Sequence, residues 1–146
     1  MRTWAIAGAL TLAGLSASAQ NTPVGLWKTI DDDGKTEKSL VRIVDTGGVV
    51  SGKVEKIFEA AKADAKCEKC EGANKDQPVI GMTIINGVKQ DPEETSIWTG
   101  GEILDPNNGK TYKVRLKPIE GGKKLEVRGY IGTPFLGRTQ TWIRAE

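Results

Sequence analysis

Two cysteines separated by two residues carry the most distinctive chemistry in this sequence. Cys67 and Cys70 are its only cysteines, and such a pair can form a disulfide, exchange disulfides with a substrate or bind a metal. Covalent haem attachment would need a histidine where Glu71 stands, and zinc would need two further ligands from carboxylates, a poor set for a structural site. If the chain is exported to an oxidising compartment, a structural disulfide is the favoured interpretation, with a redox-active pair as the alternative.

Histidine is absent from the chain. Its absence removes the usual general base at neutral pH, the common partner of a serine or cysteine nucleophile, and imidazole metal sites. The acidic turns at residues 31–34 and 105–109 lack the alternating ligands and closing glutamate of an EF-hand, so we interpret them as solvated turns. We expect a non-enzymatic protein with no cofactor and no metal.

The first nineteen residues have the pattern of an export signal. Arg2 gives a basic start, an uncharged and mostly apolar run covers residues 4–15, and Ala17 and Ala19 fit the small-x-small pattern before a cleavage site,. The run is shorter than the roughly 20 residues that span a bilayer. We predict a signal peptide at 1–19, a single domain at 20–146, and a periplasmic or secreted location without a membrane span.

The predicted mature chain is small and nearly neutral. Removing residues 1–19 from 146 leaves 127 residues, and losing Arg2 lowers the formal charge from +2 to +1. Nucleic-acid binding needs a clustered basic excess, so this balance argues against it. The composition leaves the oligomeric state open.

The elements that must position these residues are short strands. Eight or nine alternating or apolar runs are separated by turns rich in Gly, Asn and Asp, including Asn86-Gly87,. The runs cover residues 24–30, 39–44, 49–58, 79–85, 96–100, 102–104, 111–117, 124–130 and 137–144. Residues 59–78 form a long excursion with a predicted short helix at 59–65. Such a sheet must close or fold over to remove its edges, which predicts an eight-stranded antiparallel up-and-down barrel or a sandwich.

Several motifs make the sequence resemble known families. Gly25-Leu26-Trp27 on the first strand and Arg144 on the last are similar to the calycin pattern, in which the Trp closes one barrel end beneath the Arg. A closer resemblance, to the exported bacterial domain of unknown function 2147 family (DUF2147), covers nearly all of the predicted mature chain. Its motifs are Gly25–Trp27, Cys67–Cys70, Pro78–Met82, Trp98–Gly101, Asp105–Tyr112, Val127–Gly132 and Gly137–Arg144. This resemblance implies a lipocalin-like barrel and assigns no activity.

A second likeness concerns ligand binding. Arg128-Gly129-Tyr130 resembles the Arg-x-Tyr pair with which fatty-acid-binding proteins hold a carboxylate, and Arg115 and Arg138 are candidate helpers. Residues two apart on a strand share a face. However, Leu125, Val127 and Gly129 compete for the inner face, and this would place Arg128 and Tyr130 outside the barrel.

The sequence therefore predicts an exported barrel that binds a hydrophobic or amphipathic anion such as a fatty acid. Apolar lumen residues, among them Val54, Ile84, Val114 and Leu116, would desolvate the chain of this lipid-like partner. Two alternatives remain: a filled barrel that binds envelope proteins or peptidoglycan through its loops, and a thiol-disulfide redox protein acting through Cys67 and Cys70. Ligand binding requires an open lumen, whereas the first alternative requires a filled one.

Overall fold

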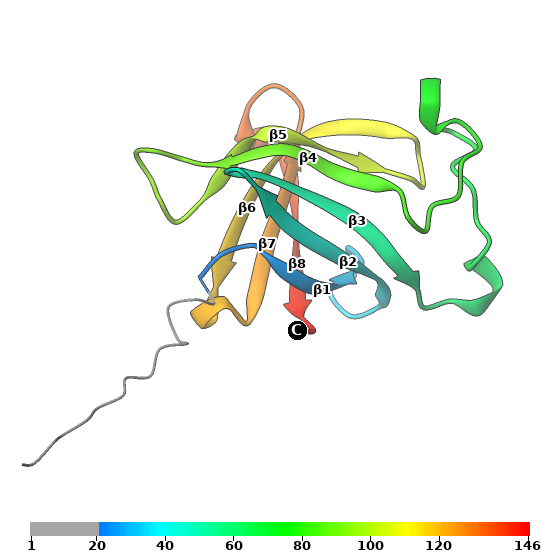
Figure 1. Ribbon diagram of the computed structural model, residues 1–146, viewed down its shortest axis with the longest axis horizontal. Coiled ribbons are helices and arrows are strands. Elements are labelled where there is room, and N and C mark those ends of the chain that lie inside the picture. Colours follow the sequence, from blue (N-terminus) through cyan, green and yellow to red (C-terminus); the bar gives the residue numbers. More distant parts are fainter. Residues whose placement is uncertain (1–20) are drawn as a thin grey trace, which may run out of the picture.

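The computed structural model describes residues 21–146; the predicted signal peptide at 1–19 lies outside them. Within this range eight strands pair antiparallel in sequence order, and β1 also pairs with β8, which closes the barrel. Figure 1 shows this arrangement. The strands are β1 (Gly25–Ile30), β2 (Glu37–Thr46), β3 (Val49–Ile57), β4 (Thr83–Gln90), β5 (Trp98–Asp105), β6 (Lys110–Ile119), β7 (Lys124–Tyr130) and β8 (Gly137–Arg144). The predicted fold class is confirmed.

The alternating direction of the strands gives the barrel two distinct ends. The turns β1–β2, β5–β6 and β7–β8 and the β3–β4 excursion lie at one end, which we call the open end. The other three turns and the pairing of Trp27 with Arg144 lie at the closed end. No helix within residues 21–146 is long and apolar enough to cross a membrane.

Large apolar side chains fill the half of the barrel nearest the closed end. They alternate along the strands with exposed polar residues, which is the period of a sheet with one buried face. Each is at most 7% exposed: Trp27, Ile43, Val50, Val88, Trp98, Leu116, Leu125 and Trp142. This packed half is the main hydrophobic core and forms a floor beneath the open end.

Two local expectations differ from the structure. Asn86-Gly87 was expected to end a strand, but both residues lie inside β4, where Gly87 has φ +73°. Between the pairs Gly52↔Ile85 and Val50↔Val88, β4 has one more residue than β3. The two residues therefore form a β-bulge, a feature that uses the same positive φ as a tight turn.

The predicted helix at 59–65 is only a 3-10 turn, η1 (Ala60–Lys62). None of its three residues is buried. A run this short needs tertiary packing to compensate for the cost of helix nucleation, and η1 has none. The rest of the excursion is irregular apart from η2 (Gly72–Asn74), and a bridge between Lys66 and Pro78 joins its two arms.

Candidate ligand-binding site

A cavity of about 790 Å³ occupies the barrel interior at the open end. Pockets for small molecules run from about 300 to 1,000 Å³, so this volume suits one guest. Its inner wall is largely apolar and comes from five strands: Val54 and Ile57 of β3, Ile84 of β4, Ile103 of β5, Tyr112 of β6, and Val127 and Gly129 of β7. The lumen is therefore half filled and half open.

Two polar side chains on the inner wall of the cavity are already hydrogen-bonded. Thr29 is the one buried polar residue within residues 21–146, and its Oγ1 lies 2.7 Å from Oγ of Ser39. The Tyr112 hydroxyl accepts a hydrogen bond of 3.0 Å from Nδ2 of Asn108. Lys, Arg, Asp and Glu are all absent from the buried residues of this range. A charged group on a guest would find its counter-charges only at the rim.

The rim of the cavity carries charges of both signs. Arg138 Nη1 lies 2.7 Å from Oδ2 of Asp32, and Gln140 donates a 2.9 Å hydrogen bond to Oδ1 of the same carboxylate. These contacts join the β1–β2 turn to the start of the neighbouring strand β8 at the rim. Lys62, which pairs with Glu59 at 3.5 Å, and the exposed Lys66 line the mouth from the excursion.

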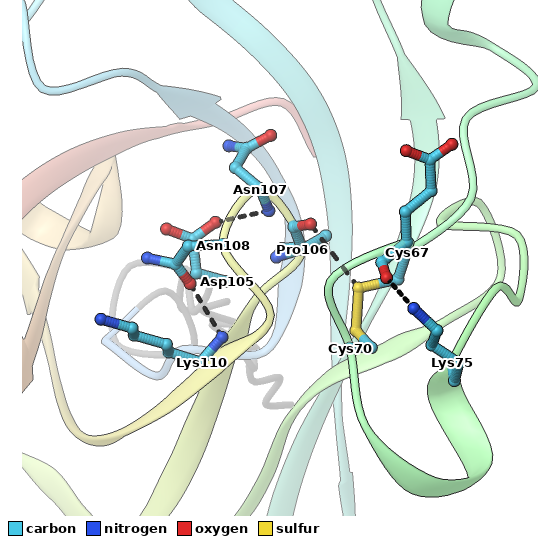
Figure 2. Close-up of a disulfide and its surroundings, with 9 residues drawn as sticks. Cys67, Cys70, Lys75, Asp105, Pro106, Asn107, Asn108 and Lys110 are labelled. Carbon is cyan, nitrogen blue, oxygen red and sulfur yellow. Dashed lines mark hydrogen bonds between the residues drawn. A yellow bond between two sulfur atoms is a disulfide. The ribbon is translucent and has the colours of Figure 1, made fainter.

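The disulfide forms where the excursion meets the β5–β6 turn, as Figure 2 shows. Cys67 is fully buried, and its Sγ lies 3.6 Å from the carbonyl oxygen of Pro106. Gly109 has φ +72°, and a Cβ there would overlap the carbonyl of Lys69. Since both segments line the cavity, their tight packing makes them one wall of its mouth.

Three of the four proposed ligand-binding residues lie outside this cavity. Arg138 lines the rim, whereas Arg115, Arg128 and Tyr130 are not among the lining residues. Strand alternation explains the separation, because Val127 and Gly129 take the inner face of β7 and turn Arg128 outward,. Arg128 instead donates hydrogen bonds of 2.7 Å to the Pro134 carbonyl and to Oγ1 of Thr139.

Only two of the four apolar residues that the sequence predicts in the lumen line the cavity. Val54 and Ile84 line the cavity, whereas Val114 and Leu116 are fully buried and belong to the packed core. Sequence reasoning missed Thr29 and Tyr112, which line the cavity from β1 and β6. The alternation of Tyr112 with Val114 and Leu116 could have placed Tyr112 inside, but not its height along the barrel axis.

Trp27 and Arg144 meet at the closed end. The Arg144 guanidinium carbon lies 4.3 Å from the centre of the Trp27 ring, and the indole nitrogen donates a 2.7 Å hydrogen bond to the Pro23 carbonyl. Arg144 also donates to the carbonyls of Gly122 and Val24, at 2.6 and 2.8 Å. A Cβ at Gly25 would overlap Nη1 of Arg144, so the glycine makes room for the guanidinium.

Comparisons with known proteins agree with this architecture. A solved structure described as "Protein HP1028 from the human pathogen Helicobacter pylori belongs to the lipocalin family" is similar, with a TM-score of 0.72 and 20% identity over 84% of this chain and 82% of that one. At this identity the similarity concerns the fold. No curated protein matches the sequence. Residues 25–144 match the model of the family described as "Uncharacterized protein conserved in bacteria (DUF2147)", and the chain therefore belongs to that family.

Proposed function

We propose that this protein is an exported, non-enzymatic carrier that binds one small amphipathic molecule, such as a fatty acid, in the open half of its barrel. The observation that carries the proposal is the half-empty lumen: a cavity of about 790 Å³ lies above a tightly packed floor. A barrel that served only as a rigid support for its loops would gain stability by filling this space with side chains.

The distribution of polarity supports an amphipathic guest. The apolar part would lie against Ile84, Ile103 and Val127, and its removal from water would supply most of the affinity, at roughly 25 cal/mol per Å² before the costs of association. A carboxylate head would stay at the mouth, where the cationic lining residues are Lys38, Lys62, Lys66 and Arg138. The absence of buried ionisable groups in residues 21–146 argues against a charged head deep inside,.

Export is part of the proposal. A disulfide in a protein of a bacterial family is favoured by an oxidising compartment,, and residues 1–19 have the pattern of a cleavable signal. The protein recovered from periplasm or medium is expected to begin at Gln20. Recovery from the cytoplasm with Met1 retained would contradict export.

Organic extraction of the purified protein, followed by mass spectrometry, tests the ligand. We expect a co-purified amphipathic molecule at up to one per protein, and saturable binding of at least one member of a fatty-acid panel after delipidation. A clean extract together with no binding across the panel would remove the carrier function and favour an interaction module that uses the loops.

The burial of the disulfide argues against the redox alternative. Cys67 is 0% and Cys70 3% exposed, and thiol–disulfide exchange requires a thiolate to reach one of the sulfurs. We therefore expect the native protein to show no exchange with glutathione on the timescale on which accessible disulfides react.

A further inference from the structure

The outer wall of the barrel has a second, smaller pocket, of about 130 Å³. It is lined from β6, β7, β8 and the β4–β5 turn by Glu94, Ile97, Arg115, Lys117, Glu126, Arg128 and Thr139. Its volume is well below the range of small-molecule pockets, and it would hold a single functional group. Three of its seven lining residues are cationic and two, Glu94 and Glu126, are acidic, so the lining carries a net positive charge.

Two of the cationic lining residues, Arg115 and Arg128, form a pair of like charges on neighbouring strands. They lie directly opposite each other on β6 and β7, an arrangement that is unfavourable for two like charges. Lys117 and Glu126 are opposite each other two register positions along, on the same face of the sheet, so the charges of this second pair compensate each other. Neither Arg115 nor Arg128 has an acidic residue directly opposite it on these two strands.

The hydrogen bonds of the two arginines differ. Arg128 is held in place by its bonds to Pro134 and Thr139, each of 2.7 Å. The Nε of Arg115 is buried without an acceptor among residues 21–146. The pKa of the nearby Asp91 carboxyl is lowered by hydrogen bonds from the Glu94 and Glu93 N–H groups and by the charge of Arg115. A buried donor left without an acceptor is costly, most of all in a charged group.

We propose that this pocket binds an oxyanion, a carboxylate or a phosphate group, between Arg115 and Arg128. Such an anion would separate the like charges, and it would accept a hydrogen bond from the Arg115 Nε after this side chain turns toward the pocket, because the Nε is otherwise buried. Planar guanidinium groups suit both carboxylate and phosphate geometry. The pocket is on the outer wall and shares no lining residue with the lumen cavity, so this site is independent of the proposed carrier function.

The test follows the arginine Nε–H signals of the ¹⁵N-labelled protein by NMR while sodium chloride is replaced by sodium phosphate, or by sodium acetate, at constant ionic strength. We expect a saturable shift of the Arg115 Nε–H signal with at least one of the two anions. Saturation by acetate alone identifies a carboxylate site, by phosphate alone a phosphate site, and by both a general oxyanion site. The absence of saturation with either anion would overturn the proposal.

Matched variants make the result specific. Arg115→Gln should weaken the same titration, read on the Arg128 Nε–H signal, by about tenfold or more, and Arg115→Lys should restore part of it through charge alone. Arg42→Gln, which removes an exposed arginine paired with Glu55, should leave it unchanged. Equal saturation in the wild type and Arg115→Gln would overturn the site. Loss of lumen binding alone would leave this titration intact, so failures of the two proposals are distinguishable.

Discussion

At the scale of single residues, Arg144 joins the two ends of the barrel sheet. It lies over the Trp27 ring and donates hydrogen bonds to the carbonyls of Thr22, Val24 and Gly122. These groups come from the N-terminal segment and the β6–β7 turn, while backbone pairing between β1 and β8 is limited to two register positions. The side chain therefore compensates for a short strand junction.

Arg144→Ala should destabilise the barrel by about 2–4 kcal/mol, because it removes a cation–π contact and several charge-assisted hydrogen bonds together. Urea unfolding followed by Trp fluorescence measures the change. Arg144→Lys should recover only part of the loss, since one ammonium cannot replace the planar fork. A free energy of unfolding within 0.5 kcal/mol of the wild type, roughly the scatter of surface substitutions, would contradict this role.

Asp32 sets the charge that Arg138 presents at the cavity mouth. Because Asp32 neutralises this guanidinium at 2.7 Å, Asp32→Asn should strengthen binding of a fatty-acid anion several-fold, as expected for exposed charges worth up to about 1 kcal/mol. The methyl ester of the same acid, which has no charge, provides the control. If the acid and the ester respond equally, the head group does not lie near Arg138.

At the scale of elements, the excursion behaves as an attached wall rather than a free loop. The Cys67–Cys70 disulfide, the Lys66–Pro78 bridge and the close approach of Gly109 to Lys69 hold it against the β5–β6 turn. Its helices contribute little, since η1 and η2 have no buried residues. The order of this wall therefore depends on the covalent link and on turn-to-turn packing.

Reducing the disulfide should lower the free energy of unfolding by about 2 kcal/mol, the chain-entropy value for so short a loop. Paired urea titrations with and without reductant measure the difference. A Cys67→Ala, Cys70→Ala double variant controls for the reductant and should not respond to it. Unchanged stability of the wild type after confirmed reduction would show that packing alone holds the wall.

The β1–β2 turn responds to acid through Asp33. Hydrogen bonds from the Thr36 hydroxyl, the Thr36 backbone N–H and the Lys35 N–H lower the pKa of this carboxyl from 3.8 to about 2. Because the folded pKa is depressed, its contribution to stability is present above pH 3.8 and is lost as the pH falls towards 2. NMR titration of the Asp33 carboxyl should give a midpoint near 2 in the folded protein and near 3.8 in urea; equal midpoints would contradict the turn geometry.

At the scale of the whole molecule, the sequence was sufficient to predict the barrel fold and insufficient to predict which part of the lumen is filled by side chains. Alternation and turn residues placed the strands, and Thr111–Lys117 in particular specified the inner face of β6 correctly. The same alternation indicated that Arg128 and Tyr130 would point outward if Leu125, Val127 and Gly129 took the inner face. It could not show that Val114 and Leu116 belong to a filled half while Ile84 faces an empty one, because cavity position depends on packing among eight strands.

The bulge in β4 shows a second reason why the sequence could not predict every local feature of the barrel. Asn-Gly satisfies a positive φ either in a hairpin or in a bulge, and only the pairing of β4 with β3 and β5 decides between them. Likewise, the close approach of Gly109 to the excursion depends on a contact between segments about forty residues apart, which local sequence does not encode.

Filling the open half of the lumen with a side chain shows whether a guest binds there. Gly129 lines the cavity, and an added Cβ would lie 3.6 Å from Cβ of Tyr112, an ordinary contact. Gly129→Phe therefore places a ring in the cavity, and Lys113→Phe places the same ring at an exposed position of β6 as a control. Titration of the delipidated proteins with a dansyl-labelled fatty acid should show one saturable site in the wild type and in Lys113→Phe, and binding at least tenfold weaker in Gly129→Phe. Equal affinity in all three proteins would place the ligand outside the lumen and exclude the proposed binding site.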